Sequence, residues 1–399
     1  MRLVALIVLR VASAASAASA QGGPSDPIAS TPPNGSATSA HSAELGACFG
    51  DARRIACAAC DTDALGGAFL CDCSGSHRSN AANACASVIS ATNASSVLVH
   101  PQPPPRLGFT SQLDDFLGHL ADACTTQSHF IYGGFHIDAG MRAAPVVPVD
   151  FFLAIEPINA FLQNHPTCHQ TRVLPWACSA VAQAGGPEML APYAAEHRCT
   201  RSINWKLAAP IRSLGGDFMA SLPLDFRRAA KSAGVGQSRP PRFNAVHFNL
   251  DCDWLLYMEK RDGKPDRMKK FKFDFKKANA VCDGSDANLK AIAFRSVAAY
   301  VNATRKMGDQ LPVLVATSIG KAGHEATQWV FDAYRAQLPG LTFFKSGAAS
   351  KYREVNAAAE LSLLLEAECF VGLGRSTFSK FVALRLRRRP APGRVWMVS

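Results

Sequence analysis

The stretch that decides the fold is residues 360–379, which read ELSLLLEAECFVGLGRSTFS. Its pattern predicts a helix, a short apolar strand at 369–372, a glycine turn and a second helix that begins at a Ser-Thr pair. Hydroxyl groups and backbone N–H groups converge at such a helix start, where the helix dipole is positive. The segment therefore predicts an anion-binding turn, with an ordinary helix cap as the simpler alternative.

The same alternation of strand and helix patterns extends over most of the chain. Short apolar runs predict three further strands, at 96–99, 243–248 and 313–316. Amphipathic patterns predict further helices, at 111–124, 289–307, 325–337 and 357–367. This order is typical of an α/β fold with parallel sheets flanked by helices. A stretch rich in Pro, Gly and Arg at 234–242 predicts the boundary between a domain at 94–235 and another at 240–385.

A second segment of interest is residues 245–254, which read AVHFNLDCDW. Its apolar strand ends in polar residues at alternate positions, namely His247, Asn249, Asp251 and Asp253. If the strand stays extended, all four side chains point to one side. Ligands bind at the carboxyl ends of parallel strands, so the pattern predicts a functional site rather than an ordinary polar strand face.

A third segment, residues 106–118, reads RLGFTSQLDDFLG and places a glycine turn between a strand and a helix. Backbone N–H groups at such a turn can approach an anionic ligand. On its own, the segment fits a plain strand-to-helix connection equally well.

The N-terminal region has the features of a secreted protein. Residues 3–9 are apolar, and Ala18-Ser19-Ala20 fits a cleavage site, which predicts a signal peptide over 1–20. A short membrane anchor is the alternative, but the run is far below the roughly 20 residues that a spanning helix needs. Residues 21–45 are rich in Ser, Ala, Pro and Gly and predict a linker without a core. We therefore expect a lumenal or secreted chain with no spanning segment after residue 20.

The cysteine pattern supports an oxidising compartment. The chain has 13 cysteines, and six of them fall in a predicted module at 46–90, namely Cys48, Cys57, Cys60, Cys71, Cys73 and Cys85. Disulfides are expected there, and a zinc site is the alternative because Cys57 and Cys60 have ligand spacing. The odd total leaves at least one thiol, and Cys252 and Cys369 are the candidates because both lie in apolar runs.

The charge of the chain narrows its partners. Its formal net charge is +11, and basic residues cluster at 227–231, 264–277 and 385–389. A secretory signal and the lack of zinc-finger or RNA-binding signatures argue against nucleic acid. Three interpretations of the basic clusters remain. They form an ordinary solvated face, they bind an anionic nucleotide-sugar, or they bind an acidic matrix polysaccharide.

In their order and spacing, the three segments together resemble the GDP-fucose protein O-fucosyltransferases. Residues 108–112 and 114–118 are similar to the family's Arg-Phe-Gly-Asn-Gln turn and Asp-His-Phe-Leu-Gly helix. Residues 247–254 are similar to its His-Leu-Arg-x-Gly-x-Asp-Trp strand. The third motif, Asp-Leu, Phe-Ile-Gly and Ser-Ser-Phe, matches Glu360, Phe370, Val371, Gly372, Ser376, Thr377 and Phe378.

The resemblance implies a GT-B-like fold of two facing Rossmann-like domains, and the cysteine pattern adds a small disulfide-rich N-terminal module that lies outside the resemblance. It implies GDP-fucose as donor substrate, inversion at the sugar carbon, no metal and no further cofactor. The acceptor is expected to be a protein Ser or Thr, or a glycan, in the endoplasmic reticulum or Golgi. By position, the donor-binding residues are Gly108, Phe109, Thr110, Ser111, His247, Phe248, Asn249, Glu360, Ser376, Thr377 and Phe378, with Glu360 at the nucleoside and Ser376 and Thr377 at phosphate.

Asn249 departs from the family pattern because it occupies the position of an arginine. An amide cannot neutralise the charge that grows on departing GDP as an arginine does. Arg375 and Lys380 lie beside the phosphate turn and are candidates to replace it, while Asp251 or Asp253 is the candidate base. Two alternatives remain: a non-catalytic relative that binds glycans or nucleotide-sugars, and a basic matrix-binding protein without an ordered cleft.

Overall fold

The protein was analysed as a computed structural model, which describes residues 96–100, 108–137, 146–147, 149–174, 196–199, 216–235, 240–271, 275–308, 310–317, 326–348, 350 and 352–399. The predicted signal peptide, linker and Cys-rich module lie outside these residues.

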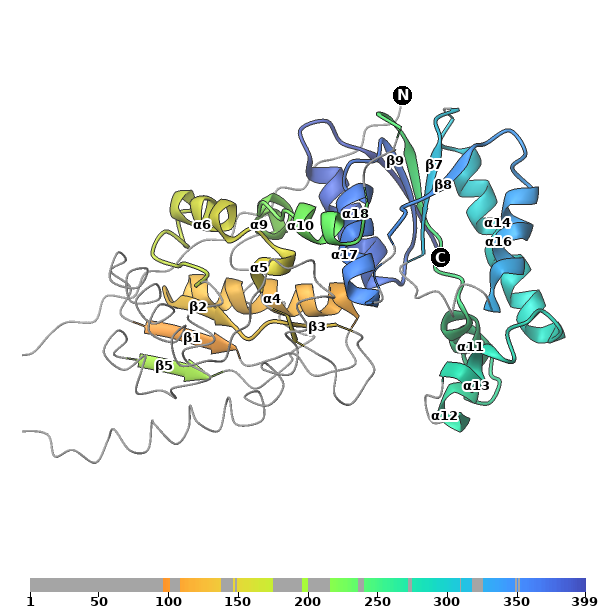
Figure 1. The fold of residues 1–399 in the computed structure, drawn as a ribbon, viewed down its shortest axis with the longest axis horizontal. Helices are drawn as coiled ribbons and strands as arrows, with labels where there is room; N and C mark the ends of the chain where they lie inside the picture. The colour runs from red at the N-terminus through yellow and green to blue at the C-terminus, as the bar shows by residue number, and fades with distance from the viewer. Residues whose placement is uncertain are drawn as a thin grey trace, which may run out of the picture.

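Two parallel sheets form the framework of the described chain, which confirms the α/β prediction (Figure 1). The smaller sheet has the order β2-β1-β5, with β1 Ser96–His100, β2 His129–Tyr132 and β5 Glu196–Cys199. The larger sheet has the order β10-β9-β6-β7-β8, with β6 Asn244–His247, β7 Val313–Ala316, β8 Phe343–Lys345, β9 Cys369–Leu373 and β10 Arg394–Val398. A short antiparallel pair is formed by β3 Phe135–His136 and β4 Val146–Val147.

The strand order of the larger sheet contains a switch point. From β6 the chain proceeds to β7 and β8 on one side, and then returns to place β9 and β10 on the other side of β6. In open α/β sheets, ligands bind outside the carboxyl ends of the strands where the order reverses. The carboxyl ends of β6 and β9 are therefore the place to look for a site. β10 also belongs to this sheet, although the C-terminal domain was expected to end at residue 385.

Helices cover both faces of the larger sheet, with α17 and α18 on one side and α14 and α16 on the other (Figure 1). The long helices are α4 Phe109–Thr125, α6 Ile155–Asn164, α11 Cys252–Arg261, α14 Ala287–Arg305, α16 Gln328–Ala336, α17 Arg353–Leu364 and α18 Thr377–Arg388. The short ones are α5 Val149–Phe152, α9 Gly216–Ser221, α10 Arg227–Ser232, α12 Arg267–Lys270 and α13 Phe275–Asn279. The helices predicted at 111–124, 289–307, 325–337 and 357–367 are confirmed, with shifted ends.

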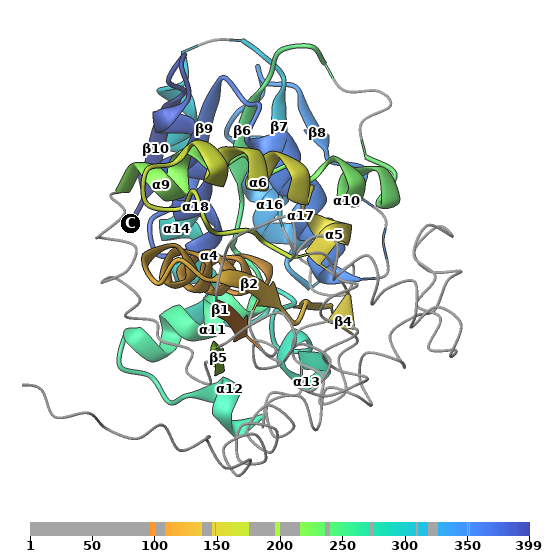
Figure 2. The ribbon, with the colours of Figure 1, turned by 90° about the vertical axis from the view of Figure 1, so that its left-hand side faces the viewer.

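The alternation of side chains along the strands of the larger sheet supplies two hydrophobic cores. Ala245, Leu314 and Phe370 pack with α17 and α18 in one core, whereas their neighbours Val246 and Val315 pack with α14 and α16 in the other. The first core also includes the apolar face of α4 and strands of the smaller sheet. Helix α4 thus lies between β1 and the pair α17 and α18 (Figure 2).

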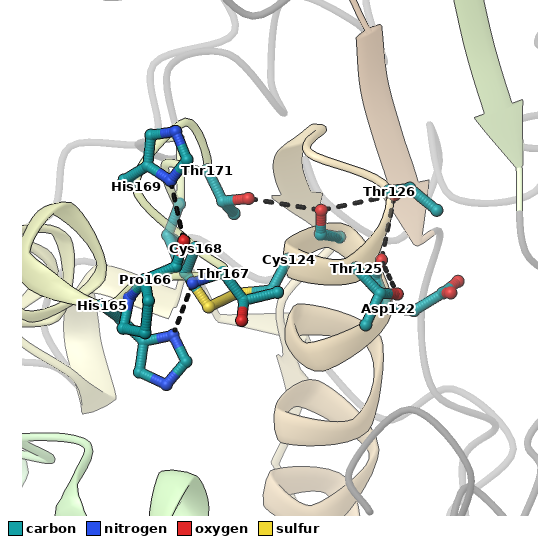
Figure 3. The surroundings of a disulfide bond; sticks show 12 residues. Asp122, Cys124, Thr125, Thr126, His165, Pro166, Thr167, Cys168, His169 and Thr171 are labelled. Carbon is teal, nitrogen blue, oxygen red and sulfur yellow. Dashed lines mark hydrogen bonds between the residues drawn. A yellow bond between two sulfur atoms is a disulfide. The ribbon is translucent and has the colours of Figure 1, made fainter. Parts of the chain in front are cut away.

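The far end of α4 is anchored by covalent and polar contacts (Figure 3). Cys124 forms a disulfide with Cys168 in the turn after α6. The hydroxyl of Thr171 donates to the carbonyl oxygen of Ala123 at 3.2 Å, and the hydroxyl of Thr126 donates to that of Asp122 at 2.9 Å. Because one end of α4 is held in this way, the position of its N-terminal end is fixed by a rigid element.

A second disulfide corrects one prediction. Cys252, expected as a free thiol, is bonded to Cys282 and so connects the start of α11 to the segment that follows α13. The apolar run around Cys252 suggested a simple buried residue, but burial is equally compatible with a disulfide. Cys369 is a buried thiol, as predicted. Disulfides are typical of oxidising compartments.

Within the part of the chain that the structure describes, no helix is both long and apolar enough to cross a membrane.

Candidate functional site

The three segments that the sequence singled out meet at one cavity of about 290 Å³. This volume is close to the lower end of the roughly 300–1,000 Å³ that is common for ligand pockets. The cavity lies at the carboxyl ends of β6 and β9, beside the start of α4. It is lined by Gly108, Phe109, Thr110, Ser111, His247, Asn249, Arg353, Glu354, Ala357, Arg375, Ser376, Thr377 and Phe378.

Two helix N-termini face each other across this cavity. Helix α4 begins after Gly108, which has no side chain with which to cap it, and α18 begins after Ser376. The hydroxyl oxygens of Thr110 and Thr377 lie 3.3 Å apart, although 267 positions separate the two residues in the sequence. Backbone N–H groups and the positive ends of two helix dipoles therefore converge on one place, which favours a negatively charged ligand.

The turn between β9 and α18 is braced by parts of the chain that the sequence did not assign. The N–H of Gly374 donates to the carbonyl oxygen of Val398 at the end of β10, at 2.7 Å. The side chain of Ser376 accepts from the N–H of Ser379 at 3.3 Å and caps the helix. A Cβ atom at Gly372 would lie 2.6 Å from the ring of Phe370 and 2.8 Å from Cβ of Ser379. Glycine at 372 is thus required for α18 to approach β9.

His247 ends β6 and is almost fully buried, with 1% of its surface exposed. Its Nδ1 lies 2.7 Å from the hydroxyl oxygen of Ser379, and its ring centroid lies 4.6 Å from that of Phe378. Burial lowers the pKa of His247 to about 3. The imidazole is therefore neutral at physiological pH and adds no positive charge to the cavity that it lines.

Two arginines line the cavity together with Asn249. Arg375, which the sequence singled out, is exposed in the turn before α18, whereas Lys380 is exposed on α18 and is not among the lining residues. Arg353 begins α17 and was not predicted. The predicted helix began at 357, which left Arg353 in an apparent loop. The sequence feature that marks the true start of this helix is the charged pair Arg353-Glu354, which stands two residues before an alanine run.

Asp251 and Asp253 do not continue the strand, and the prediction that they share one extended face with His247 and Asn249 is wrong. The strand ends at His247, and the carboxylate of Asp251 accepts a hydrogen bond of 2.9 Å from the N–H of Trp254. This contact caps α11, which begins at Cys252. A short acidic side chain before a helix start favours a cap over continued strand.

Asp251 is buried and Asp253 is half-buried, and the negative charge of one acts on the other. Burial raises the pKa of Asp251, against the hydrogen bond from Trp254 and the positive charge of Arg353. Burial and the negative charge of Asp251 raise the pKa of Asp253 to about 6, again opposed by Arg353. A carboxyl group with a pKa near 6 can accept a proton close to neutral pH. Arg353 thus lines the cavity and, through its positive charge, also acts on the pKa values of the acidic pair.

Asp251 and Asp253 are not among the residues that line the cavity, and neither are the predicted site residues Phe248 and Glu360. Phe248 is buried in the second core, where its ring centroid lies 5.2 Å from Tyr300 and 4.9 Å from Tyr334. Glu360 is buried on α17 and accepts a hydrogen bond of 3.1 Å from the hydroxyl of Ser346. The carboxylate that does line the cavity is Glu354, which the sequence did not single out.

The described residues contain no group of three or more His, Cys, Asp or Glu side chains placed to hold a metal ion.

Comparison with known proteins gives distant similarity only. No protein-family model matches the sequence, and no curated protein matches it. A crystal structure of POFUT1 in complex with GDP is similar with a TM-score of 0.44 and 13% identity, over 77% of this chain and 98% of that chain. One of POFUT1 in complex with GDP-fucose has a TM-score of 0.42 and 13% identity, over 76% and 98%. At this distance, the site has to be judged from its own residues.

Proposed function

We propose that the protein is a metal-independent, inverting glycosyltransferase that transfers fucose from GDP-fucose to a protein Ser or Thr or to a glycan. The observation that carries the proposal is the convergence of two helix N-termini and two arginines on one cavity at the switch point of a parallel sheet. A diphosphate is the group that such a cavity suits, because it needs both N–H donors and positive charge.

The donor diphosphate lies between the starts of α4 and α18 in this proposal. The hydroxyls of Thr110, Ser376 and Thr377 and the backbone N–H groups beside them donate to its oxygens. Arg375 adds a positive charge at the rim. Phe109 and the helix behind it supply the rigid wall, since the ring of Phe109 is buried against Phe135, Phe152 and Phe226. The fucose then extends toward Asn249 and Arg353.

The transfer step is a single displacement at the anomeric carbon. The acceptor hydroxyl oxygen forms a bond to this carbon as the bond from the carbon to the phosphate oxygen of GDP breaks, on the opposite side. The hydroxyl proton passes to the carboxylate of Asp253, with Asp251 as its coupled neighbour. GDP leaves with the bonding electrons, and its growing negative charge is stabilised by the helix starts and the cations.

Arg353 and Arg375 take over the role of the arginine that Asn249 replaces. A residue with fixed positive charge near the leaving diphosphate contributes roughly 10²–10³ in rate. A non-catalytic relative that binds nucleotide-sugars without turnover would also have the two helix starts. The two cavity arginines are the observation that favours an enzyme over such a relative. A matrix-binding protein would use its basic surface and leave the cavity without a role.

The proposal extends to architecture and location. The two sheets belong to two facing Rossmann-like domains in a GT-B-like arrangement, one at 94–235 and one that begins at 240 and, because its sheet includes β10, extends past the expected limit of 385. The Cys124–Cys168 and Cys252–Cys282 disulfides support folding in the secretory pathway lumen, in the endoplasmic reticulum or Golgi, or secretion.

The experiment that tests the proposal compares two neighbouring cations. Purified secreted protein is incubated with GDP-fucose, and fucose transfer and donor hydrolysis are measured for the wild type, Arg375→Ala and Lys380→Ala. Wild type turns over the donor, Arg375→Ala lowers the rate strongly and Lys380→Ala does not, because only Arg375 lines the cavity. Equal rates for Arg375→Ala and wild type, with donor affinity intact, would contradict compensation by Arg375.

Asn249→Arg distinguishes the enzyme from the non-catalytic relative. In an enzyme that already uses Arg353 and Arg375, a third cation in the cavity has a small or adverse effect through repulsion and crowding. In a binding relative, wild type shows no turnover and Asn249→Arg restores some.

A further inference from the structure

We propose that Asn302, on helix α14, carries an N-linked oligosaccharide that is attached before α14 forms. Residues 302–304 read NAT, which is the acceptor pattern Asn-x-Thr for this modification in secreted proteins. Two further triplets of this type, at 34–36 and 93–95, lie outside the described residues. The proposal rests on the lumenal location in the proposed function and not on the cavity.

The position of Asn302 in the folded protein suits a bulky modification. Asn302 lies near the C-terminal end of α14 and is exposed to solvent. Its neighbours four residues away, on the same side of the helix, are Ala298 and Lys306, and both are exposed as well. One of these side chains is small and the other is flexible. The folded protein therefore accommodates a glycan at Asn302 without a change in packing.

The hydroxyl of Thr304, the other half of the acceptor pattern, is in the opposite situation. The pattern requires a Ser or Thr hydroxyl two residues after the asparagine. Thr304 is only 2% exposed, and its hydroxyl oxygen lies 2.8 Å from that of Tyr334 on α16. Tyr334 is itself part of the second core. An enzyme that has to recognise this hydroxyl cannot reach it in the folded protein.

Helix geometry also separates the two halves of the pattern. Residues two positions apart differ by about 200° around the axis of an α-helix, which has roughly 3.6 residues per turn. Asn302 accordingly faces the solvent while Thr304 faces the core. In an extended chain, by contrast, side chains two positions apart lie on the same side. The amide and the hydroxyl are therefore recognised together only before α14 has formed.

The modification is a group transfer to the side-chain amide of Asn302. The amide nitrogen forms a bond to the first sugar carbon of a lipid-linked oligosaccharide diphosphate, as the bond from that carbon to the phosphate oxygen breaks. The lipid diphosphate leaves with the bonding electrons, and the amide nitrogen loses one proton to solvent. When α14 then packs against α16, the hydroxyl of Thr304 takes Tyr334 as its partner.

The modified face of the molecule is distinct from the cavity. Helices α14 and α16 cover one face of the larger sheet, whereas α17 and α18, which contribute lining residues to the cavity, cover the other (Figure 1). Asn302 lies on the solvent side of α14. A glycan at this position therefore leaves donor binding unchanged.

Peptide mass spectrometry of the secreted protein tests the proposal directly. Enzymatic release of an N-linked glycan converts the modified asparagine into aspartate, so the mass of the peptide records whether Asn302 was modified. The expected result is aspartate at position 302 after release. Asparagine at this position, in secreted protein that has formed its disulfides, would overturn the proposal.

Variants of the triplet separate the acceptor pattern from folding. Asn302→Gln and Thr304→Val should each remove one glycan from the secreted protein, whereas Thr304→Ser keeps a hydroxyl and should retain it. Tyr334→Phe removes the buried partner of Thr304 but not the pattern, so it should also retain the glycan. The matched control is Asn288→Gln, at an exposed asparagine of the same helix that belongs to no acceptor triplet, and it should change nothing. If Thr304→Val does not fold, Asn302→Gln still decides, because Asn302 is exposed.

The order of events is tested by depletion of the lipid-linked donor during synthesis. Chains that fold in its absence should stay unmodified at Asn302 after the donor is restored, whereas chains made afterwards should be modified. Modification of chains that had already folded would contradict attachment before α14 forms.

The outcomes also separate this proposal from the proposed function. A glycan at Asn302 in a protein with no affinity for GDP supports the modification and contradicts the GDP-sugar site. An unmodified Asn302 in secreted protein that transfers fucose contradicts the modification alone.

Discussion

The connections that follow β6 and β9 begin side by side at the switch point of one sheet, but they differ in charge. The connection after β9 presents a positive helix start, and the one after β6 presents a carboxylate. After β9, a glycine turn leads to α18, whose cap is the hydroxyl of Ser376. After β6, four residues lead to α11, and the last of them, Asp251, caps the helix with its carboxylate. A hydroxyl cap leaves the positive helix start available to an anion, whereas a carboxylate cap neutralises it. In the proposed site, the neighbouring turns therefore form an anion half and an acidic half, with Arg353 between them.

The largest expected effect concerns the acidic half. Asp253→Asn should lower fucose transfer by about 10²–10⁴, because it removes the group that accepts the acceptor proton. The pKa of Asp253 is raised to about 6, and the carboxylate is the active form, so wild-type transfer should be slow below pH 6 and rise to a plateau above it. Because Asp251 and Asp253 interact, the apparent pKa of this rise in rate, the acidic limb of the pH profile, is a property of the pair and not of Asp253 alone.

The pH profile of transfer at saturating donor measures this effect. Asp262→Asn, an exposed aspartate at the other end of α11, is the matched control and should retain the wild-type limb. A wild-type rate that does not change between pH 5 and 8 would rule out Asp253 as the base.

The next effect concerns the residue between the halves. Arg353→Ala should lower transfer about 10²–10³-fold, because a positive charge near the departing diphosphate is lost. The same variant should also raise the midpoint of the acidic limb, since Arg353 lowers the pKa of both aspartates. Arg387→Ala, at an exposed position outside the cavity, should change neither. A wild-type rate of transfer in Arg353→Ala would show that Arg353 does not compensate for the arginine that Asn249 replaces.

The two disulfides test whether the acidic half depends on its anchor. Replacing Cys252 and Cys282 by serine should cost about 2–4 kcal/mol in the free energy of unfolding, as should replacing Cys124 and Cys168. Only the first pair lies beside Asp251 and Asp253, so only its loss should lower transfer, with GDP affinity retained. Thermal denaturation and transfer assays of both double variants measure this, and equal activity in both would contradict the anchoring role.

The smallest effect concerns the anion half alone. Thr377→Ala should weaken GDP binding by about 1.5–3 kcal/mol, the cost of a hydrogen bond to a charged group. Thr125→Ala removes an exposed threonine at the opposite end of α4 and should leave the affinity unchanged. Titration calorimetry decides, and unchanged affinity in Thr377→Ala would place the phosphate elsewhere.

The sequence predicted the local structure of the anion half correctly because its signals are local, whereas anion binding there stays a prediction. A strand, a glycine turn and a capped helix follow one another within residues 369–379, and each has a recognisable residue type. The acidic half was harder, because alternating polar residues fit both an extended strand and a strand that turns into a helix. Asp251 is also a typical helix cap, and that reading was the correct one.

The remaining parts depend on contacts between distant segments. Arg353 lines the cavity from a helix more than 100 residues after Asn249, and no local pattern marks it as a partner. β10 was not expected as a strand, yet the carbonyl oxygen of its residue Val398 accepts a hydrogen bond from the N–H of Gly374 in the turn before α18. The roles of Ser379 and Gly372 likewise depend on how closely α18 approaches β9, which is a property of packing and not of sequence pattern.

In the proposed function, the two helix starts bind the diphosphate of a guanosine nucleotide. Titration calorimetry of the secreted protein with GDP, UDP and CMP tests it most directly. GDP should bind more tightly than UDP or CMP, and its affinity should fall in Thr377→Ala. Equal affinity for all three nucleotides, or no binding of GDP, would contradict it.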